Sequence, residues 1–127
     1  MKPIVGLLLC LVSIRASPTS SRGFLVDANC FRTEERNVNP DEINVPGAHD
    51  IDFEIRACYP RANKTRTFIV VLQSGEILAL DAVGNTRAAE LLVAAGAVKR
   101  RERRFAVDIT GTISNETIYV NSISSSR

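Results

Sequence analysis

The chain is 127 residues long, which is enough for one small domain with a single modest core. It carries 16 basic and 14 acidic residues. Lys2 and Arg15 account for the difference, and both lie in the first 16 residues. The rest of the chain is therefore balanced, so net charge gives no argument for binding nucleic acid or an anionic membrane.

The first 16 residues have the pattern of a cleavable signal peptide. Lys2 precedes an apolar run from Ile4 to Val12, and the small residue Ala16 stands where a signal peptidase would cut. The run is shorter than the roughly 20 apolar residues that span a membrane, and no later segment supplies them. We therefore expect residues 1–16 to be removed and the remainder to be exported, to the periplasm or outside the cell, with no transmembrane segment.

Two cysteines, Cys30 and Cys58, remain after the expected cleavage, because Cys10 leaves with the signal peptide. An even pair of thiols in an oxidising compartment predicts one disulfide. Closing a loop of this size stabilises a small domain by about 3 to 4 kcal/mol.

The next part of the chain predicts one strand and one short helix separated by a loop. Residues 17–22 are small and polar, which indicates a flexible lead-in. Residues 23–30 start with an apolar run and predict the first strand, whereas residues 31–47 have no periodicity and predict a long loop. Residues 49–58 predict a short helix, because their apolar side chains fall three and four positions apart.

The middle of the chain predicts a β-hairpin followed by a helix. Residues 67–73 and 76–81 are rich in β-branched and apolar side chains, and Ser74-Gly75 between them is a two-residue hairpin signal. Residues 87–98 carry an apolar stripe with helical spacing, and Thr86 is the expected N-cap.

Two more strands complete the domain. Residues 105–113 alternate apolar and polar side chains, which is typical of a half-buried strand. A polar turn at residues 114–116 precedes a last strand over residues 117–123, and residues 124–127 predict a tail. The fold class is mostly β with one to two helices. Five strands with a helix between the third and the fourth predict an OB-type Greek-key barrel over residues 23–123.

Several segments resemble small exported bacterial OB-fold-like domains whose function is not established. They are Gly23-Phe24-Leu25-Val26-Asp27 with Cys30, Cys58 before a Phe-Ile-Val-Val strand, Gly75 to Asp81, Val107 to Ile113, and Thr117-Ile118-Tyr119-Val120. The resemblance covers about residues 22 to 123 and implies the fold and an exported location, but it brings no catalytic residue. This chain departs from the family pattern by a basic insertion before the fourth strand.

That insertion is the most conspicuous local feature of the sequence. Its cations are Lys99, Arg100, Arg101, Arg103 and Arg104. This run has three interpretations. It could be the solvated end of a helix, a docking surface for an acidic partner or lipid headgroups, or a set of contacts to phosphate groups. OB folds that bind single strands also need exposed aromatic platforms, whereas Phe24, Phe68 and Phe105 are expected in the core. The sequence therefore does not favour nucleic-acid binding.

A second cluster places His49, Asp50, Asp52 and Glu54 within six residues. On a helix these groups do not converge, and an acidic first turn that stabilises the helix N-terminus explains them as well. We expect no metal and no cofactor. His49 is the only histidine, the chain has no Gly-x-Ser-x-Gly turn, and both remaining thiols are expected to be paired, so we expect no enzyme.

The sequence thus predicts an exported, non-enzymatic binding or interaction domain. OB folds bind on the face of strands two and three, between the loops that precede strand two and strand five. Here these are residues 68–80, 31–66 and 114–117. Polar and basic side chains in these loops favour an anionic or polar ligand: Arg56, Arg61, Lys64, Arg66 and Asn115. The partner is expected to be a small ligand or an envelope protein. The alternatives are a structural component of a cell-envelope assembly and single-stranded nucleic-acid binding through the basic run.

Overall fold

The computed structural model describes residues 17–36, 51–96 and 104–126. The expected signal peptide lies outside the described residues. The strands are β1 (Thr19–Asp27), β2 (Phe68–Leu72), β3 (Ile77–Leu80), β4 (Phe105–Ser114) and β5 (Thr117–Ser125). The helices are α2 (Ala28–Arg36), α3 (Ile51–Ala57) and α4 (Ala82–Ala95).

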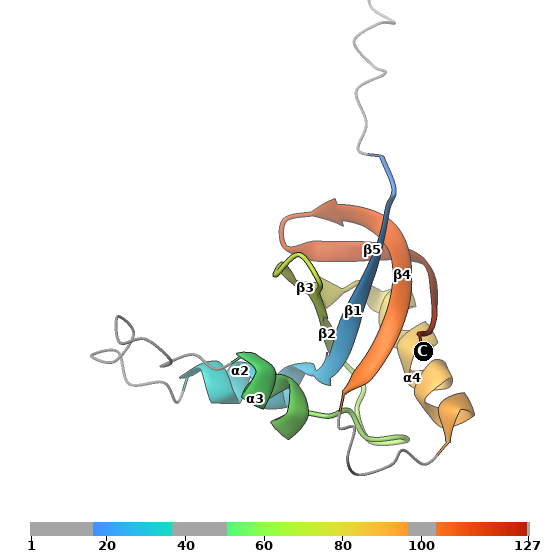
Figure 1. Ribbon diagram of the computed structural model, residues 1–127. Coiled ribbons are helices and arrows are strands. Elements are labelled where there is room, and N and C mark those ends of the chain that lie inside the picture. The colour runs from blue at the N-terminus through green and yellow to red at the C-terminus, as the bar shows by residue number, and fades with distance from the viewer. Residues whose placement is uncertain (1–16, 37–50, 97–103, 127) are drawn as a thin grey trace, which may run out of the picture.

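The strands close into a barrel in the order β1-β2-β3-β5-β4 (Figure 1). Neighbouring strands are antiparallel except β3 and β5, which are parallel. The helix α4 lies between β3 and β4 in the chain and packs against β5 and β3. This is the predicted OB-type Greek-key arrangement, and it confirms the expected fold class.

Side chains that point into the barrel form its main hydrophobic cluster, which we call the barrel core. All five strands and α4 contribute to it, and alternation along β4 selects Phe105, Val107 and Ile109 for the inside. Its members are Leu25, Phe68, Val70, Leu72, Leu78, Leu80, Ala88, Leu92, Phe105, Val107, Ile109, Ile118 and Val120. Phe68 and Phe105 are thus buried as predicted.

A second cluster lies on the outside of β1 and β2, and we call it the outer cluster. It contains Val26, Ala28, Phe31, Ile55, Cys58, Ile69 and Val71. Phe24, which was expected in the core, packs against this cluster outside the barrel and is only half-buried. Because side chains alternate along a strand, β1 and β2 serve both clusters, and every residue of β2 is buried.

The expected loop at residues 31–47 begins with a helix instead. Asp27 ends β1, and its Oδ1 accepts a hydrogen bond from the Cys30 backbone N at 3.1 Å, as an N-cap does. The helix α2 then continues to Arg36 and buries Phe31 against the outer cluster. The sequence pattern did not predict this helix, because the segment is mostly charged and only the short face toward the outer cluster is apolar. The predicted short helix before Tyr59-Pro60 is confirmed as α3.

The outer strands are longer at both ends of the domain than the sequence predicted. Thr19 to Arg22, the expected lead-in, belong to β1 and pair with β4, starting with Thr19 opposite Gly111. Ser124 and Ser125, expected in the tail, also pair with β4. Backbone pairing with the ten-residue β4 extends these strands where side-chain hydrophobicity gave no signal.

The predicted hairpin joins β2 and β3, with a loop one residue longer than expected. The Leu72 backbone N donates to the Glu76 carbonyl at 2.8 Å, and the Gly75 backbone N donates to the Leu72 carbonyl at 2.8 Å. Gly75 has a φ of 100°, a conformation that favours glycine. The connection is therefore a three-residue loop that ends in a glycine.

The helix α4 begins five residues before the predicted start. Its N-cap is Asp81, whose Oδ1 accepts from the Gly84 backbone N at 3.0 Å, and not Thr86. The segment Gly84-Asn85-Thr86, expected as a turn, lies within the helix. A Cβ at Gly84 would lie 2.5 Å from Val120 Cγ2, so the glycine lets α4 approach β5 closely.

Candidate functional site

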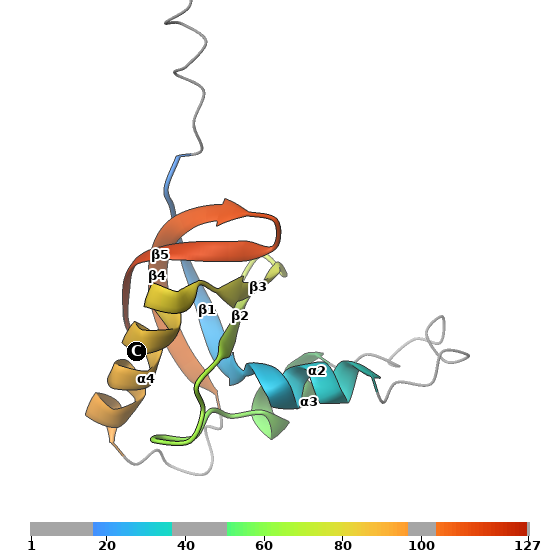
Figure 2. The ribbon, with the colours of Figure 1, turned by 180° about the vertical axis from the view of Figure 1, so that it is seen from behind.

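The face on which OB folds bind ligands is largely closed in this protein. The outward side chains of β2, Ile69 and Val71, are only 5% and 6% exposed, because they pack in the outer cluster with side chains of α2 and α3. Figure 2 shows these helices projecting from the end of β1, beside β2. The predicted disulfide between Cys30 and Cys58 is present and joins α2 to the residue that follows α3, with 5.4 Å between the Cα atoms. On the hairpin, Ile77 of β3 remains 38% exposed. The chain between β1 and β2 therefore covers the expected binding face.

The loop between α3 and β2 is anchored to the end of β1. The Thr65 hydroxyl is buried, donates to Asp27 Oδ2 at 2.7 Å and accepts from the Arg61 backbone N at 2.9 Å. The Lys64 and Thr65 backbone N atoms both donate to the Arg61 carbonyl, which makes residues 61–65 a tight turn. Asn63, at the tip of this turn, has a φ of 66°, which asparagine tolerates better than most residues. The loop thus has a fixed shape.

Three exposed cations lie on this loop, namely Arg61, Lys64 and Arg66. Residues 59–67 contain no acidic side chain, so nothing within the loop neutralises them. Arg56, the fourth predicted cation, lies on α3 and forms an ion pair with Asp52 at 3.2 Å. The structure therefore groups three of the four predicted cations on one loop.

Asn115, the fifth predicted ligand residue, lies elsewhere. It is exposed in the β4–β5 turn with a φ of 49°. Figures 1 and 2 show this turn at one end of the barrel and the loop of residues 59–66 at the other. One small ligand cannot contact both, so Asn115 does not share a site with the loop cations.

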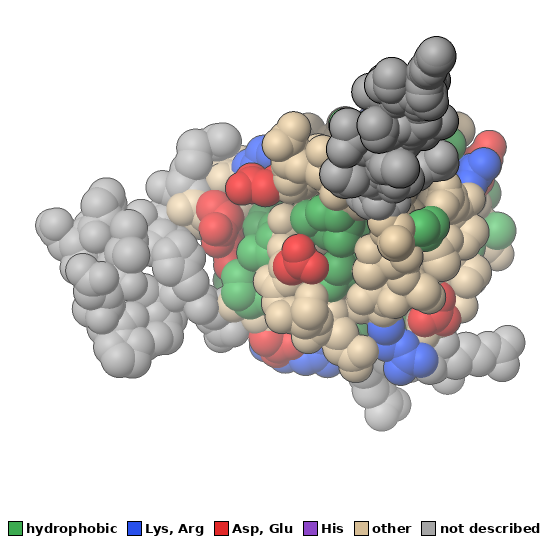
Figure 3. Space-filling view, turned by 90° about the horizontal axis from the view of Figure 1, so that it is seen from above, with side chains coloured by type: hydrophobic (Ala, Val, Ile, Leu, Met, Phe, Trp, Pro, Cys, Tyr) green, Lys and Arg blue, Asp and Glu red, His purple; other side chains and the backbone are tan. Residues whose placement is uncertain are grey.

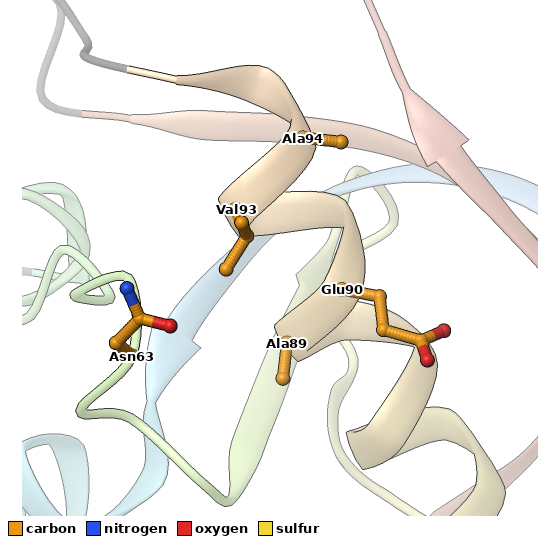
Figure 4. Close-up of a pocket in the computed structure, with 5 residues that line it drawn as sticks. All are labelled: Asn63, Ala89, Glu90, Val93 and Ala94. Atoms are coloured by element: carbon orange, nitrogen blue, oxygen red, sulfur yellow. The ribbon is translucent and has the colours of Figure 1, made fainter.

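A shallow pocket of about 420 Å³ lies where this loop faces α4. It is lined by Asn63, Ala89, Glu90, Val93 and Ala94. In Figure 4, Val93 points from α4 toward the loop that carries Asn63, while the Glu90 side chain extends away from Asn63. Val93 is 52% exposed, so its methyl groups are accessible from the pocket. The volume falls in the range of small-molecule sites.

No local pattern in the sequence predicts this pocket. Its helical wall, with Ala89 and Val93 four residues apart, lies beside the apolar stripe that predicted the core face of α4. Its other wall comes from a loop more than twenty residues earlier in the chain. The residues that hold that loop, Asp27 and Thr65, were also missed as a pair.

Of the basic run, only Arg104 lies within the described residues. Its Nε donates to Asp52 Oδ1 at 2.9 Å, which joins the start of β4 to α3. This hydrogen bond, together with the positive charges of Arg104 and Arg56, holds the pKa of the Asp52 carboxyl below its ordinary value, against the opposing effect of desolvation. Lys99, Arg100, Arg101 and Arg103 lie outside the described residues.

The predicted cluster of His49, Asp50, Asp52 and Glu54 also lies only partly within the described residues. His49 and Asp50 lie outside the described residues, Asp52 is exposed, and Glu54 is buried on the other side of α3. Within residues 17–36, 51–96 and 104–126, no three acidic, histidine or cysteine side chains gather as metal ligands would. The described helices are also too short or too polar to cross a membrane.

The end of the barrel near the β4–β5 turn presents another mixed surface. Figure 3 shows hydrophobic side chains gathered on this face, with acidic side chains among them and basic side chains toward the edge. Tyr119 on β5 is 51% exposed. The two ends of the molecule thus differ in character, since the described loop at the opposite end carries cations and no acidic group.

Comparisons with protein-family models, with curated proteins and with solved structures found no match for this chain.

Proposed function

We propose that this chain is an exported, non-enzymatic binding domain that takes an anion with a short apolar tail. The site is the pocket between α4 and the loop of residues 61–66. One observation carries the proposal: an apolar helical wall with an exposed Val93 faces a hydrogen-bonded loop that carries three exposed cations and no acidic residue of its own.

The two walls suit the two parts of such a ligand. Ala89, Val93 and Ala94 offer methyl groups that an alkyl tail covers, and burying that area is favourable. Arg61, Lys64 and Arg66 have long side chains that carry their charge away from the backbone turn, so a carboxylate or phosphate at the rim of the pocket finds a cation. Medium-chain fatty acids and lipid fragments belong to this ligand class.

The closed outer face of β2 and the Cys30–Cys58 disulfide support the rest of the proposal. Every residue of β2 is buried, so this strand offers no aromatic platform for stacked bases, which argues against single-stranded nucleic acid on the usual OB binding face. A disulfide is typical of proteins that work in an oxidising compartment outside the cytoplasm.

The test is a calorimetric titration with octanoate, using octanol and acetate as controls for the tail and the charge. We expect octanoate to bind more tightly than either control. Replacing Arg61, Lys64 and Arg66 by Gln should weaken octanoate binding about tenfold, since an exposed charge pair contributes ~0.2–1 kcal/mol. The same change should leave octanol unaffected, and Arg32→Gln, on exposed α2, is the matched charge control.

A second pair of variants tests the apolar wall. Val93→Trp should fill the pocket and abolish binding, whereas Val83→Trp, equally exposed on the same helix but away from the pocket, should not. Glu90→Gln should strengthen octanoate binding about twofold to fivefold by removing a like charge. Equal binding of octanoate and octanol, or no effect of Val93→Trp, would overturn the proposed site.

A further inference from the structure

The structure contains two hydrophobic clusters that share β1 and β2 but no side chain. Leu25, Val70 and Leu72 point into the barrel core, while Val26, Ile69 and Val71 point out into the outer cluster. No residue of α2 or α3 belongs to the barrel core. The barrel interior is therefore complete without the two helices.

Packing, the disulfide and several polar contacts hold the two helices against the barrel; among these contacts, the Asp27 backbone N donates to the Cys58 carbonyl at 2.9 Å. The helices are nine and seven residues long, shorter than helices that are stable alone in water. Phe31 and Ile55 are their large apolar side chains in the outer cluster. One covalent link, Cys30–Cys58, joins them, and the exposed ion pair of Asp52 with Arg104 connects α3 to β4.

The barrel, in contrast, is closed by backbone pairing between all neighbouring strands, of which the parallel β3–β5 contact is the shortest. β4 pairs with β1 and β5 along most of its length, and β2 pairs with β1 and β3. Neither cysteine lies on a strand. Breaking the disulfide therefore removes a constraint from the helices and none from the strand ladders.

We infer that the Cys30–Cys58 disulfide is a redox-sensitive latch: its reduction releases α2 and α3 from the outer face of β1 and β2 while the barrel stays closed. The released face is apolar, since it carries Val26, Ile69 and Val71. This inference is independent of the ligand site on α4.

The chemistry is ordinary exchange with a dithiol such as dithiothreitol. Cys30 is half-buried and Cys58 only 2% exposed, so a thiolate of the reductant reaches the Cys30 sulfur first and the Cys58 sulfur leaves as a thiolate. The second thiolate of the reductant then closes its cyclic disulfide and displaces Cys30. Each protein sulfur takes up one proton, the protein gains two electrons, and dithiothreitol loses them. A Cys58 thiolate among apolar side chains is unfavourable, which favours opening of the outer cluster.

Hydrogen exchange of the whole chain, measured by mass spectrometry with and without dithiothreitol, tests the inference. We expect amide protection in α2 and α3 to fall at least about tenfold on reduction, while protection in β4 and β5 changes less than about twofold. Fluorescence of a dye that binds apolar surface should rise at the same time. The Cys30→Ser, Cys58→Ser double variant should show the reduced pattern without reductant and should not respond to it.

Two results would overturn the inference. If β4 and β5 lose protection together with α2 and α3, the disulfide holds the whole fold. If the amides of α2 and α3 stay protected after reduction, with the free thiols verified by mass, packing in the outer cluster keeps the two helices in place without the disulfide. The double variant separates either result from incomplete reduction.

Discussion

The barrel core and the outer cluster lie on opposite sides of the same two strands, yet they are built differently. The barrel core draws on five strands and α4, and backbone ladders surround it. The outer cluster depends on two short helices that one disulfide joins. Burial alone therefore does not tell how much a residue contributes to global stability, because the number of independent elements around it also matters.

Matched phenylalanines give the largest expected effect. Phe68 is 1% exposed in the barrel core and Phe31 is 3% exposed in the outer cluster. Phe68→Ala should lower the free energy of unfolding by about 3 to 5 kcal/mol, measured by urea denaturation. Phe31→Ala should lower the free energy of unfolding by clearly less, and its main effect should be a loss of amide protection against hydrogen exchange in α2. Equal losses for the two variants would remove the distinction between the clusters.

The contact of α4 with β5 gives an intermediate effect and tests whether this helix belongs with the barrel. Alanine usually stabilises a helix relative to glycine by about 1 kcal/mol. At Gly84 the added Cβ would lie 2.5 Å from Val120 Cγ2 and 2.8 Å from Asp81 Oδ1. We therefore expect Gly84→Ala to destabilise the protein by about 1 to 3 kcal/mol.

A double-mutant cycle with Val120→Ala is the control for Gly84. The cost of the alanine at position 84 should shrink in the Val120→Ala background, because the nearest clashing methyl group is gone. A rise in melting temperature for Gly84→Ala alone would contradict the close approach of α4 and β5.

The smallest expected effect concerns the ion pair that links α3 to β4. The pKa of Asp52 is lowered in the folded state from an ordinary value of 3.8, so the pair stabilises above that value. This contribution is lost as the pH falls through the lowered folded pKa. The stability difference between the protein and Asp52→Asn should therefore vanish in strong acid and should shrink with added salt.

Two arginine variants refine that measurement. Arg104→Gln removes the hydrogen bond that is the largest cause of the shift, whereas Arg56→Gln leaves it in place. Arg104→Gln should therefore raise the pKa of Asp52 more. A difference between the protein and Asp52→Asn that stays constant from neutral to strongly acidic pH would contradict the pairing.

The predictable part of the fold is the part whose signal is local. Alternation along residues 105–113 and the glycine at position 75 were sufficient to predict β4 and the hairpin. The boundaries of α4 were wrong because Gly84 resembles a turn residue until its closeness to Val120 is known. The helix α2 was missed because its buried face rests on Phe31, although Asp27 before Ala28 is a capping signal.

The candidate site was less predictable for the same reason. Arg61, Lys64 and Arg66 could be named because they are neighbours in the sequence. The position of their loop beside Val93 could not be predicted, because it depends on the hydrogen bond between Thr65 and Asp27 that ties the loop to β1. Asn115 was grouped with them by analogy with OB barrels, in which the loops before strands two and five flank the binding face.

The pairing of β1 with β4 also has a consequence for how the chain acquires its fold. β1 is the first strand to be synthesised, and it pairs from Thr19 opposite Gly111 to Leu25 opposite Phe105. Until β4 arrives, one edge of β1 presents unpaired amide and carbonyl groups. Ring closure at such sequence separation slows folding and prolongs exposure to aggregation. Pairing of β1 with β4 is therefore a step at which a folding chaperone can protect an exposed edge.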